Sequence, residues 1–254
     1  MITHSEKESK LFNLKFGRYE GIMHNPQLLR HQILNEQFDF VRLKLLNPGE
    51  DLFVFLNQIG FPFHLLDIHR LYDLDLHTYD IPEMEVPEME FVPCDGSQIE
   101  QMKQLIKDTY TEVPMGYFRS ELIEKYFPVH LQIENFASHI SENYFEQGNP
   151  AKHGWLIKLN EEFIGCAATE FKNEKSYTPY IGLLPHFRKK HLFTNIARYL
   201  QRAMKQGGCQ YATGAARLHN IASQVNFERE GQKYVSHDYV FMLMPGLTPS
   251  RGIQ

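Results

Sequence analysis

The sequence predicts an α/β protein made of a smaller N-terminal half and a larger second half. Segments in which apolar and polar residues alternate, as in half-buried strands, are interleaved with segments whose apolar residues recur at helical spacing. Between the halves, residues 77–90 carry two prolines and five acidic residues, and each proline biases its predecessor away from helix. We therefore expect an N-terminal α/β half over residues 1–78, an extended connector over 79–90, a larger half over 91–246 and a loose tail over 247–254.

The N-terminal half is predicted to follow the order β-α-β-α-β. A proline stands in the first turn of its first helix, where it is tolerated, and Gly60 is a natural stop for its second helix. The expected elements are a strand within 16–23, a helix over 26–37, a strand within 38–46, a helix within 48–60 and a strand over 64–76. Strands this short do not make a stable sheet alone.

The larger half is predicted to start with a strand and two helices and to continue through three consecutive strands. The first helix is expected to be capped near Asp95 or Ser97, and the second to stop at Gly148. Residues 159–163 are predicted to form a hairpin turn, although they lack the usual Asn-Gly pair. The expected elements are a strand and a helix within 88–110, a helix over 131–149, strands over 154–160, 163–171 and 176–184, a helix over 192–206, a strand over 209–214, a helix over 220–230 ending at Gly231, and a strand over 234–244.

The two halves contain a faint internal similarity. Residues 55–61 and 67–76 give a short helix, a glycine and an alternating strand, and residues 226–232 and 236–244 give the same series. Duplication and chance both explain this pattern, and the sequence leaves the choice open.

The overall composition excludes several classes of protein. A net charge of -5 argues against a dedicated nucleic-acid binder. The polar start and the lack of a long apolar run predict a protein without a signal peptide or membrane partner, and we expect a cytoplasmic location. Cys94, Cys166 and Cys209 show no CxxC spacing and are expected to be reduced thiols. The 13 histidines show no H-E-x-x-H spacing, so no metal site is expected.

The stretch Pro179–Phe193, PYIGLLPHFRKKHLF, has the layout of a loop that holds a phosphate. An apolar run ends at Pro185, four basic or histidine residues follow, and an amphipathic helix begins. Unpaired N–H groups at a helix start bind anions, and neighbouring cations strengthen the binding. The glycines that usually let the backbone approach a phosphate are missing, and a solvated basic turn is the alternative interpretation.

These residues resemble the signature of the GNAT acetyltransferase superfamily, [QR]-x-x-G-x-[GA], which follows a proline at the end of the fourth strand. Pro185 and Arg188 match it, whereas His191 and Phe193 replace the two glycines. The order of elements also resembles that of the family over about residues 88–244. The resemblance implies a central mixed, mostly antiparallel sheet flanked by helices, with an N-terminal half that extends the sheet or covers the substrate cleft.

Two further matches extend the resemblance. Asn220, Phe227 and Gly231 keep the spacing of the family's Asn, Tyr and Gly, but phenylalanine replaces the tyrosine. Residues 181–184, IGLL, are similar to a run in the TDP-fucosamine acetyltransferase group, whose members also have a smaller N-terminal α/β half.

The resemblance implies an N-acyltransferase that uses acetyl-CoA as cosubstrate. Its acceptor would be the amine of a nucleotide-linked deoxyamino sugar, possibly a TDP-sugar, which attacks the thioester directly in a ternary complex. Two alternatives stay open: a GNAT enzyme acting on an amino acid, antibiotic or peptide, and a catalytically degenerate GNAT domain used for binding. Family members are often dimers, so a homodimer is possible.

The resemblance also implies roles for individual residues. The backbone N–H near Leu184 would stabilise the oxyanion, Tyr180 or Glu170 would act as general base, and a donor such as Tyr234, Tyr239 or His219 would replace the missing tyrosine. The residues implied to contact coenzyme A are Leu183, Leu184, Arg188, Lys189, Lys190, His191, Leu192, Phe193, Thr194, Asn220 and Phe227. Structural roles are the alternative, since the leucines fit a core and Asn220 fits a helix cap.

Overall fold

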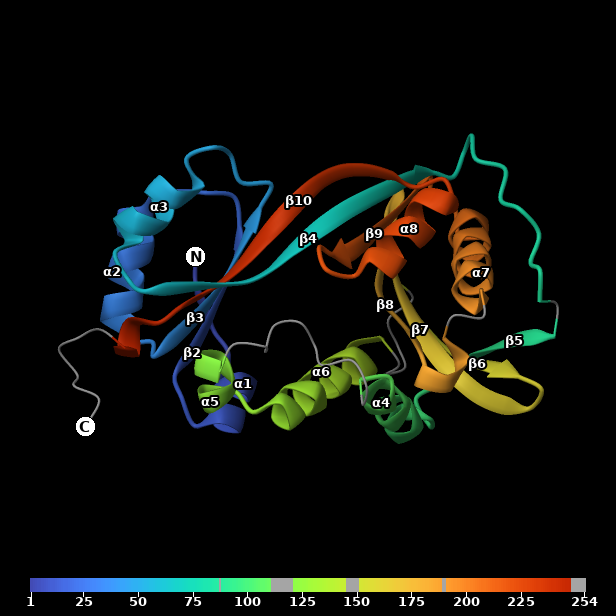
Figure 1. The fold of residues 1–254 in the computed structure, drawn as a ribbon, viewed down its shortest axis with the longest axis horizontal. Helices are drawn as coiled ribbons and strands as arrows, with labels where there is room; N and C mark the ends of the chain where they lie inside the picture. The colour runs from blue at the N-terminus through green and yellow to red at the C-terminus, as the bar shows by residue number, and fades with distance from the viewer. Residues whose placement is uncertain (87, 111–120, 145–150, 189–190, 248–254) are drawn as a thin grey trace.

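The computed structural model describes the chain except for residues 87, 111–120, 145–150, 189–190 and 248–254. The described residues form one mixed sheet of ten strands with helices on both faces (Figure 1), as the sequence predicted. The strands are β1 Thr3–His4, β2 Phe16–Gly21, β3 Phe40–Leu46, β4 Phe63–Asp75, β5 Met89–Pro93, β6 Lys152–Leu159, β7 Glu162–Lys172, β8 Lys175–Leu183, β9 Tyr211–Arg217 and β10 Lys233–Leu243. The α-helices are α1 Glu6–Phe12, α2 Pro26–Glu36, α3 Leu52–Ile59, α4 Ile99–Asp108, α5 Glu121–Tyr126, α6 Val129–Tyr144, α7 Leu192–Gln206 and α8 Ile221–Arg229.

The sheet runs without a break through both halves of the chain, because two long strands cross between them. The strand order is β1-β2-β3-β10-β4-β9-β8-β7-β6-β5. The C-terminal strand β10 therefore pairs with β3 of the first half, and β4 of the first half pairs with β9 of the second. In Figure 1, β4 and β10 run side by side across the middle of the molecule.

The strand order is symmetric about the β4–β10 pair. Each half contributes two parallel neighbours, β2 with β3 and β8 with β9, and a third strand that pairs beyond its own half. The similar sequences noted above fall at matching places, since Gly60 follows α3 before β4 and Gly231 follows α8 before β10. Both glycines have positive φ, 73° and 79°. This arrangement supports duplication as the origin of the two halves.

Separate apolar clusters cover the two faces of the second half of the sheet. On one face, α4 and α6 pack on β6 and β7 around Met102, Ile106, Ala137 and Cys166. On the other face, α7 packs around Ile164, Ile196 and Leu200. The helical spacing that predicted residues 192–206 thus describes the buried side of α7.

Several local predictions were less accurate. The helix α4 begins after Gln98 with no side-chain cap, because Asp95 instead accepts hydrogen bonds from Ser97. The hairpin turn forms without a glycine, since Asn160 and Glu161 both adopt positive φ. The elements β1, α1 and α5 were not predicted; α1 and α5 span seven and six residues, too short to show a helical pattern. Gly148 and most of the tail lie outside the described residues.

The three cysteines are not paired with one another. Cys94, Cys166 and Cys209 are free, and burial raises the pKa of the Cys94 thiol to about 12, so this thiol is not a nucleophile at neutral pH. In the part of the chain that the structure describes, no helix is long and apolar enough to cross a bilayer.

The connector is not the solvated spacer that its acidic composition predicted. Tyr79, Ile81, Met84 and Val86 pack against the apolar cluster beneath α7. Polar groups of α7 hold it as well: the Asn195 side chain accepts hydrogen bonds from the backbone N–H groups of residues 85 and 86. The connector therefore fixes the position of α7.

A buried ion pair fastens the same helix to its surroundings. The Arg198 guanidinium donates to the Glu230 carboxylate at 2.8 Å and to the backbone carbonyl of Glu83 at 2.7 Å, and it also contacts the carboxylate of Glu85. Only 2% of the Glu230 side chain is exposed. The pair joins α7, the connector and the end of α8.

Replacing Arg198 with alanine is expected to lower the free energy of unfolding by roughly 3–5 kcal/mol, because the Glu230 carboxylate is left buried without its partner. Urea denaturation of both proteins measures the change. Arg202→Ala is the matched control: it removes an exposed arginine of the same helix that also donates to a connector carbonyl, that of Pro82, and should cost less than about 1 kcal/mol. Equal losses in the two variants would contradict a buried, paired Arg198.

Candidate functional site

The strands β8 and β9 separate part of the way along their length. Their parallel pairing runs from Lys175 and Tyr211 to Thr178 and Gly214 and then stops. β8 nevertheless continues to Leu183 and β9 to Arg217. Two strand edges therefore face each other without pairing, over roughly 16 Å of β8 at 3.3 Å per residue. The point of separation, at Gly214, is called the apex below.

The orientation of β8 decides which of its N–H groups point toward β9. The Leu184 amide donates to the Ile164 carbonyl of β7 at 2.9 Å, so it is not free for a ligand. Because successive residues of a strand direct their amides to opposite edges, those of Leu183 and Ile181 point toward the separated edge. The predicted oxyanion donor near Leu184 is therefore not the Leu184 amide itself; of the two amides that face the open edge, that of Ile181 lies nearer the apex.

The start of α7 lies next to the end of β8, as expected for a phosphate-binding loop. His191 precedes the helix in the left-handed conformation (φ 58°, ψ 9°) and gives no side-chain cap. The first-turn amides of Leu192, Phe193 and Thr194 therefore have no capping side chain among the described residues. Lys189 and Lys190 lie outside those residues.

The left-handed His191 explains how the loop forms without the family's glycine. Glycine is favoured where φ is positive because it has no Cβ, and His191 takes this conformation directly.

The side chain of Arg188 points back into the protein. Its guanidinium donates to the carbonyls of Leu183, at 3.1 Å, and Thr109. It thereby joins the end of β8 to the end of α4. The expected contact of Arg188 with phosphate stays a prediction, and the described hydrogen bonds give it a structural role.

Tyr180 is buried in the packed interior between β8 and α4. Its hydroxyl lies 2.6 Å from the Thr109 hydroxyl, and burial raises its pKa well above the usual value. A phenol in this position does not lose its proton at neutral pH, so the structure argues against Tyr180 as general base. Gly182 is required here, because a Cβ on it would lie 2.0 Å from the Tyr180 hydroxyl.

The two α8 positions of the family pattern have structural contacts. Asn220 caps the helix by accepting a hydrogen bond from the Ser223 amide at 3.2 Å. Phe227 is buried and packs near Tyr72 and Phe193. Its ring lies close to Gly214, at the apex.

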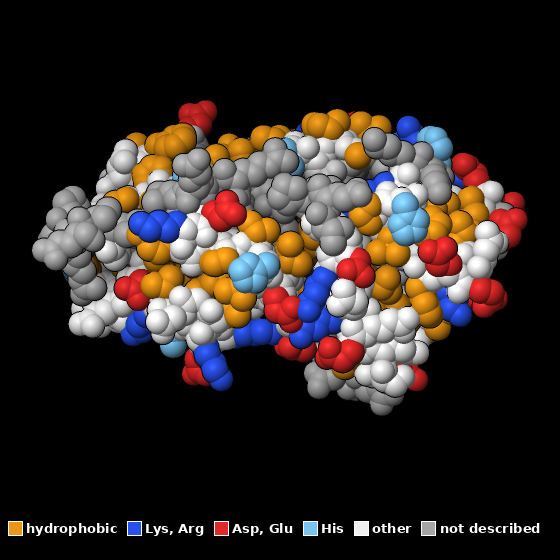
Figure 2. Space-filling view, turned by 60° about the horizontal axis from the view of Figure 1, so that its bottom comes forward, with side chains coloured by type: hydrophobic (Ala, Val, Ile, Leu, Met, Phe, Trp, Pro, Cys, Tyr) orange, Lys and Arg blue, Asp and Glu red, His pale blue; other side chains and the backbone are white. Residues whose placement is uncertain are grey.

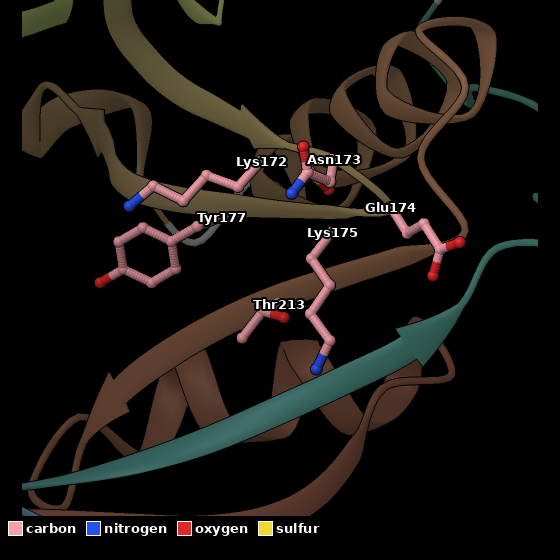
Figure 3. Close-up of a pocket in the computed structure, with 7 residues that line it drawn as sticks. Lys172, Asn173, Glu174, Lys175, Tyr177 and Thr213 are labelled. Carbon is pink, nitrogen blue, oxygen red and sulfur yellow. The ribbon is translucent and has the colours of Figure 1, made fainter.

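A pocket of about 650 Å³ opens beside the apex. Figure 3 shows its lining residues, which come from the β7–β8 hairpin and the paired parts of β8 and β9. Tyr177 and Thr213 form the pair just before the last one at the apex. The lining residues are Lys172, Asn173, Glu174, Lys175, Ser176, Tyr177 and Thr213. Sequence reasoning missed this pocket, because nothing in the sequence showed how β8 and β9 align.

Glu170 lies next to this pocket. Its carboxylate pairs with the pocket residue Lys172 at 3.2 Å and accepts a hydrogen bond from the Tyr144 hydroxyl at 3.4 Å. Burial, and then the Glu170 charge, raise the pKa of Tyr144, so that phenol stays a donor. Among the predicted bases, Glu170 is the one whose ion-pair partner lines the pocket.

Tyr234 and Tyr239 lie on β10, a strand that does not border the separated edges. The Tyr234 hydroxyl is 2.6 Å from Nδ1 of His237, and 44% of the residue is exposed. Tyr239 packs against Phe241, part of the apolar cluster of the N-terminal half. These contacts give neither phenol a position at the apex.

Charged residues gather on the central strands near the open end of β9. The buried Asp67 carboxylate lies 3.4 Å from Arg217, 3.8 Å from His69 and 3.8 Å from His219. Burial raises the pKa of Asp67. Burial, together with the charges of Arg217, Arg42, Lys44 and His219, lowers the pKa of His69 to about 3. This group joins residues far apart in sequence, so the sequence gave no sign of it.

Two general observations limit the kind of site. Among the described residues, no group of histidine, cysteine and acidic side chains is arranged to hold a metal. On the face shown in Figure 2, basic and acidic side chains alternate rather than form a field of one sign.

Part of the second half of the chain is similar to a known protein family. Residues 112–231 match the model of the acetyltransferase (GNAT) family. This region includes α7, α8 and both separated strands. No significant match is found among curated proteins.

Solved structures of similar fold span nearly the whole chain. A GCN5-related N-acetyltransferase from Kribbella flavida matches with a TM-score of 0.58 at 15% identity, over 93% of this chain and 83% of that chain. A putative GNAT acetyltransferase from Novosphingobium aromaticivorans matches at 0.53 and 12%, over 90% and 84%. A tandem GNAT protein from the clavulanic acid biosynthesis pathway matches at 0.53 and 10%, over 86% and 68%. These likenesses establish the GNAT fold, and the TDP-fucosamine subgroup stays a prediction.

Substituting glycine for His191 is expected to keep the loop and to raise the free energy of unfolding by up to about 1 kcal/mol, because glycine adopts positive φ without strain. His191→Val should lower it by about 1 kcal/mol or more, since a β-branched residue is disfavoured there. Urea denaturation measures both. A destabilising glycine would show that His191 does not hold this conformation.

The half-buried His69, whose pKa is lowered, is expected to make the protein less stable in acid. Its pKa is about 3 in the folded state and about 6.5 unfolded, so stability present above pH 6.5 is lost progressively between pH 6.5 and 3. From pH 7 to 5 this loss is roughly 2 kcal/mol. Denaturation at several pH values should show a smaller loss in His69→Gln. An identical slope in both proteins would rule out His69 as the cause.

Proposed function

We propose that this chain, which carries the GNAT fold and a GNAT acetyltransferase domain, transfers acetyl from acetyl-CoA to the amine of a small molecule. The separation of β8 and β9 beside an uncapped helix start is the observation that carries the proposal. An extended pantetheine arm would add to the free edge of β8, with its pyrophosphate at the first turn of α7. Its thioester end would then lie at the apex.

The backbone supplies the chemistry that this step needs most. As the amine attacks, negative charge develops on the thioester oxygen, and an N–H group held on a strand stabilises this charge without reorganising. The Ile181 amide has the required direction and is nearer the apex than that of Leu183. Positioning of the two substrates provides much of the remaining rate enhancement.

The pocket beside the apex is the proposed acceptor site. Tyr177 and Thr213 line it next to the point where the thioester would lie, and Lys172 and Lys175 add positive charge farther out. Two lysines favour an acceptor that carries an anionic group as well as an amine. A nucleotide-linked deoxyamino sugar has this chemistry, and an amino acid has it too.

Glu170 is the proposed proton acceptor for the attacking amine. An ammonium group must lose a proton before it can attack, and the Glu170 carboxylate lies beside the pocket residue Lys172. A water molecule would carry the proton between the amine and the carboxylate.

The alternative function is binding without catalysis. Phe227 favours it, because this residue cannot donate a proton where the family pattern has tyrosine. The left-handed His191 weakens that case, since it takes the positive φ that glycine favours.

The proposal predicts that acetyl-CoA binds and that Lys189 and Lys190 contribute to its binding. Replacing both with alanine should weaken the affinity by about tenfold and make it less dependent on salt, because charge-assisted contacts with phosphate are lost. Isothermal titration calorimetry at two salt concentrations measures both effects. The absence of binding at millimolar acetyl-CoA would overturn the proposed function.

A matched pair of lysines separates the two subsites. Lys172→Ala with Lys175→Ala removes the same charge from the acceptor pocket, and should leave the affinity for acetyl-CoA unchanged. Thiol release with a panel of amines then identifies the acceptor class. Acceptors with a phosphate or carboxylate should lose more activity in this variant than neutral amines.

A further inference from the structure

One face of the apex is closed by residues from three different elements. A Cβ on Gly214 would lie 2.9 Å from the Phe227 ring and 3.1 Å from Oε1 of Gln232. Tyr72 of β4 pairs with Gly214, and its ring centroid is 5.3 Å from that of Phe227. We call Tyr72, Gly214, Phe227 and Gln232 the apex group.

Two polar atoms of the apex group are buried without a hydrogen-bond partner. The Tyr72 hydroxyl and Oε1 of Gln232 have none among the described residues, and the two residues are 0% and 8% exposed. A buried polar atom in this state costs about 1–3 kcal/mol, and native proteins rarely keep one without a use. The Phe227 ring beside them offers no partner. The arrangement therefore suits a ligand with a polar atom at this point.

We infer that the Tyr72 hydroxyl donates a hydrogen bond to the sulfur of coenzyme A and protonates the thiolate as it leaves. This inference rests on the proposed function, which brings the sulfur to the apex. The donor comes from the N-terminal half of the chain, carried to the site by β4. It stands beside Phe227, the residue that cannot donate.

The proposed step is balanced. The amine nitrogen forms a bond to the thioester carbon, the C–S bond breaks, and its electron pair leaves on sulfur. The phenol proton moves to sulfur and gives the free thiol, while the amine loses one proton through Glu170 and water. Solvent then returns a proton to the phenolate, so the products are the amide and coenzyme A.

The surroundings of Tyr72 keep its phenol protonated until the reaction. Burial raises its pKa, which Glu228 of α8 and Tyr234 of β10 raise further and Arg70 of β4 lowers. The Arg70 guanidinium lies 5.7 Å from the ring centroid. At neutral pH the group is a donor, as the proposed step requires.

Coenzyme A and an analogue whose thiol is replaced by hydrogen test the inference without knowledge of the acceptor. Calorimetry at about pH 9, where part of the coenzyme A thiol is ionised and the thiolate can accept a hydrogen bond, compares the two ligands. The wild-type protein should bind coenzyme A about tenfold more tightly than the analogue, the gain expected for a hydrogen bond to a charged group. Tyr72→Phe should bind both equally.

Tyr234→Phe is the matched control. It removes a neighbouring phenol whose ring lies 6.2 Å from that of Tyr72 but whose hydroxyl bonds to His237, and should keep the wild-type preference. Because the Tyr72 hydroxyl is buried without a described hydrogen bond, Tyr72→Phe should keep or raise the wild-type melting temperature.

The outcomes separate the inference from the proposed function. If the wild-type protein binds neither ligand, the proposed function fails and the inference fails with it. If it binds both and Tyr72→Phe keeps the preference for the thiol, the inference alone is overturned. A lower melting temperature with an unchanged preference also overturns it, since that result assigns the hydroxyl to a buried water.

Discussion

The position of β4 between β9 and β10 is the constraint on which the rest of the structure depends. β4 belongs to the N-terminal half, yet its longest pairings are with two strands of the second half. These hydrogen bonds join the strands of the two halves into one continuous sheet. They also hold β9 from its outer side. β9 is therefore fixed in place where its pairing with β8 ends, and the separation does not depend on β8.

The symmetry about β4 and β10 allows the proposed ligand site in the second half to be compared with its counterpart in the first. β2 and β3, the counterparts of β8 and β9, pair along the whole of β2. The counterpart of the α7 start is equally closed, because Asn25 caps α2 through the amides of Gln27 and Leu28, and Pro26 has no N–H. In the N-terminal half, the edges of β2 and β3 and the first amides of α2 are thus already hydrogen-bonded, unlike their counterparts in the second half. Its contribution to the site is made by side chains on β4.

Local chemistry allowed much of the fold to be predicted from the sequence. Helices such as α7 and the one that ends before Gly60 were predicted correctly, because a few neighbouring residues mark where each begins or ends. The exchange of β4 and β10 was not predicted, because strand pairing between distant segments leaves no local pattern. The choice of Leu184 as the oxyanion donor failed for the same reason. The direction of the Leu184 amide is set by its hydrogen bond to Ile164, a residue of another strand. The Asp67 group and the docked connector likewise depend on contacts between segments far apart in sequence.

The departures from the family pattern differ in how easily the fold can absorb them. The glycine positions encode a backbone shape, and His191 reaches that shape at a cost of about 1–2 kcal/mol, which the clamped α7 helix can sustain. The tyrosine position encodes a side-chain donor, and no adjustment of the backbone makes phenylalanine donate a proton. A chain without this tyrosine can therefore keep a proton donor only if another side chain reaches the position of the tyrosine hydroxyl. The continuous sheet makes this possible, because β4 of the N-terminal half pairs with β9 and places its residues beside the apex in the second half.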